Sequence, residues 1–296
     1  MTNKKSKIIC FGEILWDVFP TEKIAAGSPM NVAYYATQLG IDTQMISKIG
    51  KDELGVDLMK FLHQKKINTQ LIQTDENLQT GIANVKLHTN GSTSYEIIEP
   101  VAWDYIYTTA ANKTAVKNSD AFVFGSLAAR NHATKNTLLT LLKLAKLKIF
   151  DVNLRASFYS KPLLIELFKE ADIVKMNDEE LQIIGALFEI KDTLKITATL
   201  LKIHFNWQQL IITRSTNEAW LFYENGMISS SSIVIQVQDT MGSDDSFVAA
   251  FLCKLLENKS PKKCLQFAVA TAAYIATKKG GTPEFSEAEI LKLIDD

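Results

Sequence analysis

The stretch "DTMGSDDSF", residues 239–247, stands between two contrasting sequence patterns. The β-branched run 233–237 before it predicts a strand, and residues 243–257 carry apolar side chains at helical spacing. The first turn of a helix exposes free N–H groups and a partial positive charge, so it is suited to binding an anion such as phosphate. Asp239, Asp244 and Asp245 therefore either cap this helix or act beside a ligand bound there.

Short apolar, β-branched runs alternate with amphipathic segments along most of the chain. The strand-like runs are 7–12, 43–50, 121–125, 149–153, 172–177 and 210–215. The helical patterns include 28–40, 52–66, 134–148 and 163–170. This alternation predicts an α/β fold with a mainly parallel sheet that is covered by helices on both faces.

Two segments interrupt the alternation. Residues 14–20 follow the first strand with no helix between them, and residues 81–98 alternate around the hairpin dipeptide Asn90-Gly91. They predict a small antiparallel sheet that covers a site, within a single domain spanning 1–296. The lid is expected to comprise about 13–26 and 81–105. A second hairpin is predicted at Glu224 to Gly226.

Composition excludes several classes of protein. The net charge of −1 favours neither nucleic acid nor an anionic membrane as a partner, and no apolar run is long enough for a membrane span. The sequence begins without the apolar stretch of a signal peptide. Cys10, Cys253 and Cys264 lie among apolar neighbours, which favours buried free thiols in a reducing compartment. We expect a cytoplasmic protein.

Polar residues follow the predicted parallel strands, where ligands bind in open α/β sheets. Each one alone could end a strand or cap a helix, but capping residues have no reason to gather at one edge of a sheet. The polar residues at these strand ends are Glu13, Asp17, Gly27, Asn31, Asp151, Asn153, Arg155, Asn177, Glu180, Ser215, Thr216, Asp239, Gly242, Asp244 and Asp245.

Several ordered motifs resemble those of the ribokinase-like (pfkB) carbohydrate kinases, and most closely those of the fructokinases. They are "GEILWDVFP", "AGSPMNVAYYATQLG", "SKIGKDELG", "SYEIIEPVAWD", "FGSLAAR", "FDVNLR", "NDEE", "DTMGSDDSF" and "GGTPEF". The resemblance implies a three-layer α/β/α domain with a small β-sheet lid. It also implies phosphoryl transfer from ATP to a hydroxyl of a sugar, for which a ketohexose is expected.

The resemblance assigns roles to individual residues. Asp245 matches the catalytic base, and the backbone N–H groups of Gly242, Ser243 and Asp244 match the anion hole. The positions that match sugar binding are Asp17, Gly27 and Asn31, with Tyr95 from the lid and Arg155 beside them. The positions that match nucleotide binding are Asn177, Glu180, Thr213, Ser215 and Gly242.

The resemblance also implies cofactors and partners. Asn177 and Glu180 are expected to organise Mg²⁺ through water, because Mg²⁺ keeps several of its waters. The partners are a small-molecule sugar and ATP. A monovalent cation and a homodimer formed through the lid remain open.

The chain departs from the family pattern mainly on the ATP side. Asp244, Ser215 and Glu218 stand at positions where the family commonly has glycine, and Ala26 replaces one glycine on the sugar side. The "ATAAYIA" segment carries alanine where a glycine often contacts adenine. Two alternatives therefore stay open beside a fructokinase. One is a sugar-binding or regulatory protein with a degenerate nucleotide site, and the other is a nucleoside-type kinase of the same fold.

Overall fold

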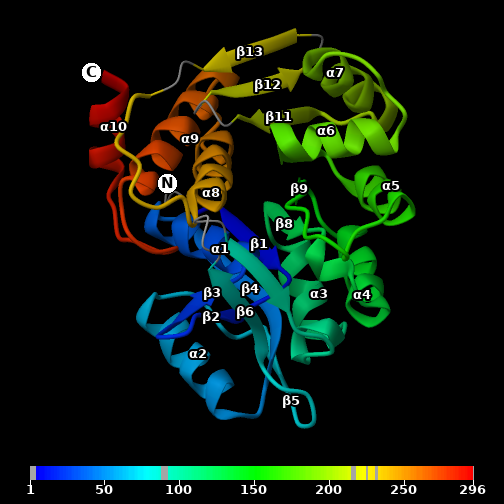
Figure 1. The fold of residues 1–296 in the computed structure, drawn as a ribbon, viewed down its shortest axis with the longest axis vertical. Helices are drawn as coiled ribbons and strands as arrows, with labels where there is room; N and C mark the ends of the chain where they lie inside the picture. Colours follow the sequence, from blue (N-terminus) through cyan, green and yellow to red (C-terminus); the bar gives the residue numbers. More distant parts are fainter. Residues whose placement is uncertain (1–4, 88–92, 215–217, 225, 231–232, 296) are drawn as a thin grey trace.

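The structure is a computed structural model that describes residues 5–87, 93–214, 218–224, 226–230 and 233–295. Its centre is a nine-stranded sheet in the order β13-β12-β11-β10-β9-β8-β1-β4-β5 (Figure 1). The strands are β1 (Lys7–Phe11), β4 (Asp42–Gly50), β5 (Ile72–Asp75), β8 (Ala121–Gly125), β9 (Lys148–Asp151), β10 (Ile173–Asn177), β11 (Gln209–Thr213), β12 (Ala219–Tyr223) and β13 (Gly226–Ser230). The pairings from β5 to β11 are parallel, and the two at the β13 edge are antiparallel.

Helices cover both faces of this sheet. One face carries α1 (Ser28–Gln38), α2 (Glu53–Gln64), α8 (Ser243–Leu256), α9 (Pro261–Ala276) and α10 (Glu287–Asp295). The other face carries α3 (Ala110–Lys117), α4 (His132–Leu142), α5 (Lys161–Glu170), α6 (Asp178–Leu187) and α7 (Leu194–Phe205). Short 3₁₀ turns lie at Ala102–Tyr105 and Leu127–Ala129. The prediction of a three-layer α/β/α fold is confirmed.

The alternation within β1 shows why its sequence forms a central strand. Ile8 and Cys10 point into the core on the α1 and α8 side, whereas Ile9 and Phe11 point into the opposite core. All four side chains are fully buried, as expected for a parallel strand with helices on both faces.

A second sheet, in the order β3-β2-β6-β7, stands beside the carboxyl ends of the parallel strands. It comprises β2 (Leu15–Val18), β3 (Lys23–Ala26), β6 (Gly81–Leu87) and β7 (Thr93–Ile97), and these strands lie within the segments predicted to form the lid. The β2–β3 and β6–β7 pairings are antiparallel, and β2 pairs with β6 in parallel. The predicted turn at Asn90-Gly91 lies outside the described residues.

Several local predictions can be compared with the structure. The hairpin at Glu224 to Gly226 is confirmed, because β12 and β13 pair in an antiparallel manner from Tyr223 and Gly226 onward. The strand predicted at 233–237 is wrong: these residues are irregular, and Val234 is almost fully exposed. A β-branched run becomes a strand only where a neighbouring strand accepts its hydrogen bonds. The helix predicted over 134–148 ends early, at Leu142, where the chain turns towards β9.

Two further expectations concern the cysteines and membrane-spanning segments. The three cysteines are buried free thiols, as expected. Among the described residues, no helix has the length and apolar character needed to cross a membrane.

Candidate active site

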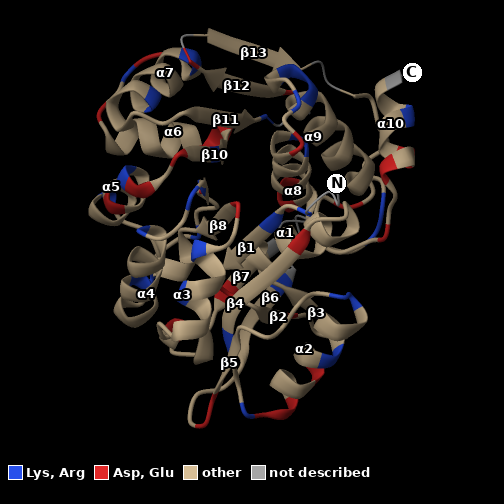
Figure 2. Cartoon of the chain, turned by 180° about the vertical axis from the view of Figure 1, so that it is seen from behind, with Lys and Arg blue, Asp and Glu red and all other residues tan. Residues whose placement is uncertain are grey.

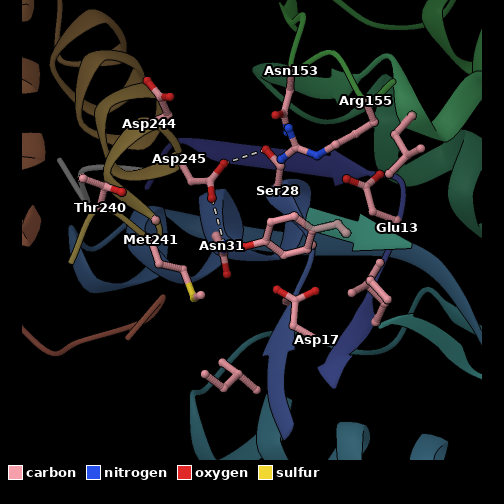
Figure 3. A pocket seen from close by; sticks show the side chains of 18 of the residues that line it. Glu13, Asp17, Ser28, Asn31, Asn153, Arg155, Thr240, Met241, Asp244 and Asp245 are labelled. Atoms are coloured by element: carbon pink, nitrogen blue, oxygen red, sulfur yellow. Dashed lines mark hydrogen bonds between the residues drawn. The ribbon is translucent and has the colours of Figure 1, made fainter. Parts of the chain in front are cut away.

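A cavity of about 750 Å³ opens where the carboxyl ends of β1, β9 and β10 meet the N-terminus of α8 and the inner face of the small sheet (Figure 3). The small sheet contributes alternate residues to it, including Leu15 and Asp17 from β2 and Tyr95 and Ile97 from β7. The intervening Trp16 faces away from the cavity, packs against Phe61 of α2 and donates to the Leu54 carbonyl. The two-residue period of the strands therefore gives this sheet one face for the cavity and one for α2.

Asp245 lies in the first turn of α8 and is buried. Its two carboxylate oxygens are held by different donors from the start of α1. The Ser28 hydroxyl donates to Oδ1 at 2.6 Å, and the Asn31 amide Nδ2 donates to Oδ2 at 2.8 Å (Figure 3). Burial raises the pKa of Asp245 and Asp244 raises it further, whereas the hydrogen bonds from Ser28 and Asn31 lower it. The carboxylate is thus fixed in orientation at the edge of the cavity.

The turn before α8 is braced from two directions. Asp239 accepts hydrogen bonds from the backbone N–H groups of Met241 and Gly280, both at 2.9 Å. Gly242 has a φ of 78°, and a Cβ atom there would collide with the Gly281 carbonyl oxygen and the Tyr35 hydroxyl. Only glycine fits this close approach, so the start of α8 is held at a defined depth.

Asp244 is turned towards a buried lysine. Its Oδ1 lies 2.8 Å from Lys175 Nζ and accepts the Thr213 hydroxyl at 3.2 Å. The Asp244 side chain is 54% exposed, whereas that of Lys175 is only 3% exposed. Burial opposes ionisation of Asp244, but Lys175 and Thr213 outweigh it and lower the pKa. The negative charge that stands at a family glycine position is therefore paired with a cation inside the protein.

Lys175 is a site residue that the sequence analysis missed. It was included in an apolar run, 172–177, that predicts a buried strand. A lysine inside such a run must pair with an anion, because an unpaired buried charge is very costly. The presence of a lysine in a buried strand was therefore the signal in the sequence that could have identified this residue. In the structure Lys175 lies between Asp244 and Asp151, whose Oδ1 is 3.5 Å from Nζ.

The five predicted substrate-binding residues all line the cavity: Asp17, Gly27, Asn31, Tyr95 and Arg155. Burial raises the pKa of Asp17 to about 6, although Arg155 opposes this rise. The Asn31 carbonyl oxygen Oδ1 is buried and has no hydrogen-bond partner within the described residues. It offers an acceptor for a ligand hydroxyl beside Asp245.

Glu13 is a second buried acceptor in the cavity, and no specific role was assigned to it from the sequence. It is only 3% exposed, and its Oε2 lacks a hydrogen-bond partner in the part of the chain that the structure describes. Burial raises its pKa to about 7, despite the lowering effect of its own backbone and of Arg155. The Oε2 atom can accept a hydrogen bond from a polar ligand, and the carboxyl group can donate one to the ligand when it is protonated.

A second cavity, of about 540 Å³, adjoins the first. Residues that line both cavities are Asn177, Glu179, Thr240 and Asp244. Its floor is formed by small residues of α9, including Ala272, Ala273 and Ala276, and its wall by Thr213 at the end of β11. Ser215 lies outside the described residues. Glu218 accepts hydrogen bonds from Arg214 at 2.6 Å and from the Trp220 indole N–H at 2.9 Å.

Asn177 and Glu180 form a reciprocal cap at the start of α6. The Asn177 side chain accepts from the Glu180 N–H, and Glu180 Oε2 accepts from the Asn177 N–H, both at 2.8 Å. Glu180 Oε1 accepts from the Leu154 N–H at 2.7 Å, which fixes the loop that carries Arg155. Among the described residues, no group of three or more His, Cys, Asp or Glu side chains is arranged to hold a metal directly. Glu180 therefore fits a metal contacted through water better than one bound directly.

The first cavity has a strong excess of acidic residues. Its acidic lining residues are Glu13, Asp17, Glu22, Glu179, Glu180, Asp239, Asp244 and Asp245, and its basic ones are Arg155, Lys175 and Lys279. Figure 2 shows acidic positions on both sides of the site, at the start of α6 and on α8. With eight acids against three bases, a polyphosphate that enters needs accompanying cations.

Comparisons with known proteins give one consistent result. The profile of the family described as "pfkB family carbohydrate kinase" matches residues 2–288. Probable fructokinase-2 of Arabidopsis thaliana is 26% identical over 310 residues, which cover 95% of this chain and 93% of that protein.

Solved structures agree in fold. The crystal structure of fructokinase with bound ATP from Xylella fastidiosa has a TM-score of 0.87 at 22% identity and covers 99% of both chains. An uncharacterised sugar kinase from Pyrococcus horikoshii, in complex with ATP, has a TM-score of 0.83 at 28% identity. It covers 96% of this chain and 97% of that one.

Proposed function

The chain belongs to the pfkB family of carbohydrate kinases, and from this premise we propose that it is a fructokinase, which transfers the terminal phosphoryl group of ATP to a hydroxyl of fructose. The choice of fructose follows the curated fructokinases that match the chain nearly end to end. One observation carries the proposal: Asp245, a fixed and buried carboxylate, lies at the edge of a polar cavity that adjoins a second, alanine-lined cavity.

Asp245 is the general base of the proposed reaction. A fructose hydroxyl bound in the first cavity donates its proton to the carboxylate as the oxygen attacks phosphorus. Ser28 and Asn31 use one acceptor position on each carboxylate oxygen, and each oxygen has a second lone pair for the substrate. The base therefore keeps its orientation while it accepts the proton.

The N-terminus of α8 stabilises the charge of the transferred group. The backbone N–H groups of Gly242, Ser243 and Asp244 form the proposed anion hole at the positive end of the helix dipole. The Ser243 N–H donates to the Thr240 carbonyl at 3.2 Å, so it must leave that acceptor, or share its single hydrogen, to contact the phosphoryl group. Lys175, whose Nζ lies 2.8 Å from Asp244, supplies a cation beside the negative charge at this family glycine position. Neither a degenerate site nor a nucleoside acceptor is favoured by the relatives.

The sugar is held by the polar residues of the first cavity. Asp17 and the free carbonyl oxygen of Asn31 accept hydrogen bonds from adjacent hydroxyls, and Gly27 contributes to the lining beside them. Tyr95 covers the sugar from the small sheet, and Arg155 faces the phosphate of the product. The small sheet, within segments 13–26 and 81–105, acts as the lid that excludes water.

The alanine-lined cavity accommodates the nucleotide. Thr213, at the end of β11, lines it, Ser215 is assigned to the nucleotide by the family resemblance alone, and the small side chains of α9 leave space for an adenine ring. Glu180 and Asn177 would order the waters of a bound Mg²⁺, which would supply positive charge to the phosphates. The proposal also includes a monovalent cation, a homodimer formed through the lid and a cytoplasmic location, which suits the free thiols.

The test is release of ADP in the presence of Mg²⁺ with fructose, glucose, ribose or a nucleoside as acceptor. We expect fructose to give the highest kcat/KM. Asp245→Asn should lower kcat by about 10²–10⁴-fold, the usual contribution of a general base, while thermal unfolding stays unchanged. Turnover that is equal in this variant would refute the role of Asp245. Preference for another acceptor would refute the assignment to fructose.

A further inference from the structure

Lys175 has two anionic neighbours of very different character. Asp151 is 4% exposed on the neighbouring strand β9, and its Oδ1 has no hydrogen-bond partner within the described residues. Asp244 is half exposed in the first turn of α8 and makes the shorter contact, 2.8 Å against 3.5 Å. Asp151 is therefore the buried neighbour of Lys175, with a pKa that burial raises to about 7 although Lys175 lowers it, and Asp244 is the exposed partner that can leave.

The carboxylates around Lys175 hold it in its charged form. Burial alone would lower the pKa of this lysine, but the nearby carboxylates, Asp151 first, raise it above its usual value. An ammonium group has three hydrogen-bond donors. Among the described residues, only the donor to Asp244 lies at close hydrogen-bonding distance from an acid, so Lys175 has donors for a further anion.

The position of the pair matters for the reaction. Asp244 lines both cavities, and Lys175 lines the first. A phosphoryl group that passes from the alanine-lined cavity to an acceptor beside Asp245 must cross this boundary. On its way it meets a carboxylate and a buried ammonium that are already paired.

We propose that Lys175 binds the terminal phosphate of ATP, and that Asp244 is a resident anion which this phosphate displaces from Lys175. The inference rests on the proposed function for the identity of the nucleotide, but it does not depend on which sugar is the acceptor. The exchange replaces one carboxylate–ammonium contact with a phosphate–ammonium contact and releases Asp244 to solvent, which its half-exposed side chain already reaches.

This exchange gives the unusual aspartate a defined effect. Asp244 competes with the terminal phosphate for Lys175, and it has no such competition with the two inner phosphates. It should therefore weaken binding of a triphosphate much more than binding of a diphosphate. The chain thereby becomes less selective for ATP over ADP than it would be with a neutral residue at 244.

The experiment is calorimetric titration, without sugar, of Mg²⁺-ADP and of the Mg²⁺ complex of the non-hydrolysable β,γ-imido analogue of ATP. Asp244→Asn keeps the shape and removes the charge. We expect it to tighten binding of the triphosphate analogue by about tenfold, the scale of one charge-assisted hydrogen bond, with little change for ADP. In Lys175→Gln/Asp244→Asn this gain should disappear.

Glu179→Gln is the matched control, because Glu179 is an exposed carboxylate that lines both cavities. It removes the same charge, but Glu179 is not one of the carboxylates paired with Lys175, so both nucleotides should respond equally. An equal response in Asp244→Asn would overturn the proposal, as would weaker binding of the triphosphate. Thermal unfolding checks that each variant is folded. If the double variant is unfolded, the comparison of Asp244→Asn with the wild-type protein decides the test.

The binding titration separates this inference from the proposed function. A selective gain for the triphosphate in Asp244→Asn supports the exchange even if fructose is not phosphorylated. Turnover of fructose with no selective gain supports the proposed function and rejects the exchange. Failure of the wild-type protein to bind either nucleotide would reject both.

Discussion

Ser28 donates its hydroxyl hydrogen to Oδ1 of Asp245 at 2.6 Å, although the two residues are 217 positions apart in the chain. The contact joins the first residue of α1 to the first turn of α8, and Asn31 reinforces it one turn further along α1. The orientation and the charge of the proposed base therefore depend on a hydroxyl group from the opposite end of the sequence.

Replacing Ser28 by alanine should shift the acid limb of the pH–rate profile. The base must be ionised, so kcat/KM falls as the pH drops through the pKa of Asp245. Burial raises this pKa and the Ser28 hydrogen bond lowers it, so Ser28→Ala should move the fall-off to higher pH. Steady-state measurements of kcat/KM over about pH 5–9 determine where the acid limb of the profile lies. Ser28→Thr, which keeps a hydroxyl, should restore it, and an unmoved limb in the alanine variant would contradict the role.

The position of Gly27 should tolerate no side chain. Its φ is +127°, and a Cβ atom would collide with the backbone carbonyl of Glu13. Gly40 also has a positive φ, +84°, but nothing lies within 4 Å of its virtual Cβ. Gly40→Ala should therefore cost about 1 kcal/mol of unfolding free energy from backbone strain alone, and Gly27→Ala about 3 kcal/mol or more. Urea unfolding compares the two, and similar losses would mean that the collision is relieved by local movement.

The buried Glu13 should make stability depend on pH. Burial raises its pKa from 4.5 to about 7, so the folded protein holds a proton that the unfolded chain releases. The stability from the neutral form is complete below about pH 4.5 and is lost as the pH rises through about 7, by at most about 3 kcal/mol. Glu13→Gln should flatten this decline in urea unfolding at pH 5.5 and pH 8, and be the more stable protein at about pH 8. Glu22→Gln, an exposed acid of the same cavity, is the control, and an equal slope in all three proteins would contradict the prediction.

Enlarging a side chain in the alanine-lined cavity should separate nucleotide binding from sugar binding. Ala272 is partly exposed on α9 and lines only the second cavity, so leucine can be introduced there without overpacking the core. We expect Ala272→Leu to raise the KM for ATP by about tenfold and to leave the KM for fructose unchanged. Gln266→Leu adds the same residue to an exposed position on the same helix and should change neither. A rise in the KM for fructose would place the sugar, not the nucleotide, near α9.

The sequence predicted the layers of the fold and the edge of the sheet where the cavity lies. Runs such as 121–125 are apolar on both faces, and parallel strands with polar residues at their carboxyl ends must bring those residues together. Asp17, Asn31 and Arg155 were found in this way and line one cavity. The prediction needed only local patterns and the geometry of parallel sheets.

Partners across the molecule could not be predicted in the same way. Ser28 looks like an ordinary first residue of a helix, and its role appears only once α1 packs against α8. The neutralisation of Asp244 likewise depends on the depth of Lys175 in β10. The run 233–237 has the composition of a strand, but composition does not specify whether a neighbouring strand is available to pair with it. Each of these results depends on contacts between distant segments.

A single residue, Gly27, separates the last residue of β3 from Ser28 at the start of α1. Strand β3 belongs to the sheet over the cavity, and Ser28 holds the carboxylate at its far side. Because this connection is so short, a displacement of β3 also moves the start of α1. The position of strand β3 is therefore coupled to the orientation of the Asp245 carboxylate. A bound ligand that shifts β3 also reorients this carboxylate.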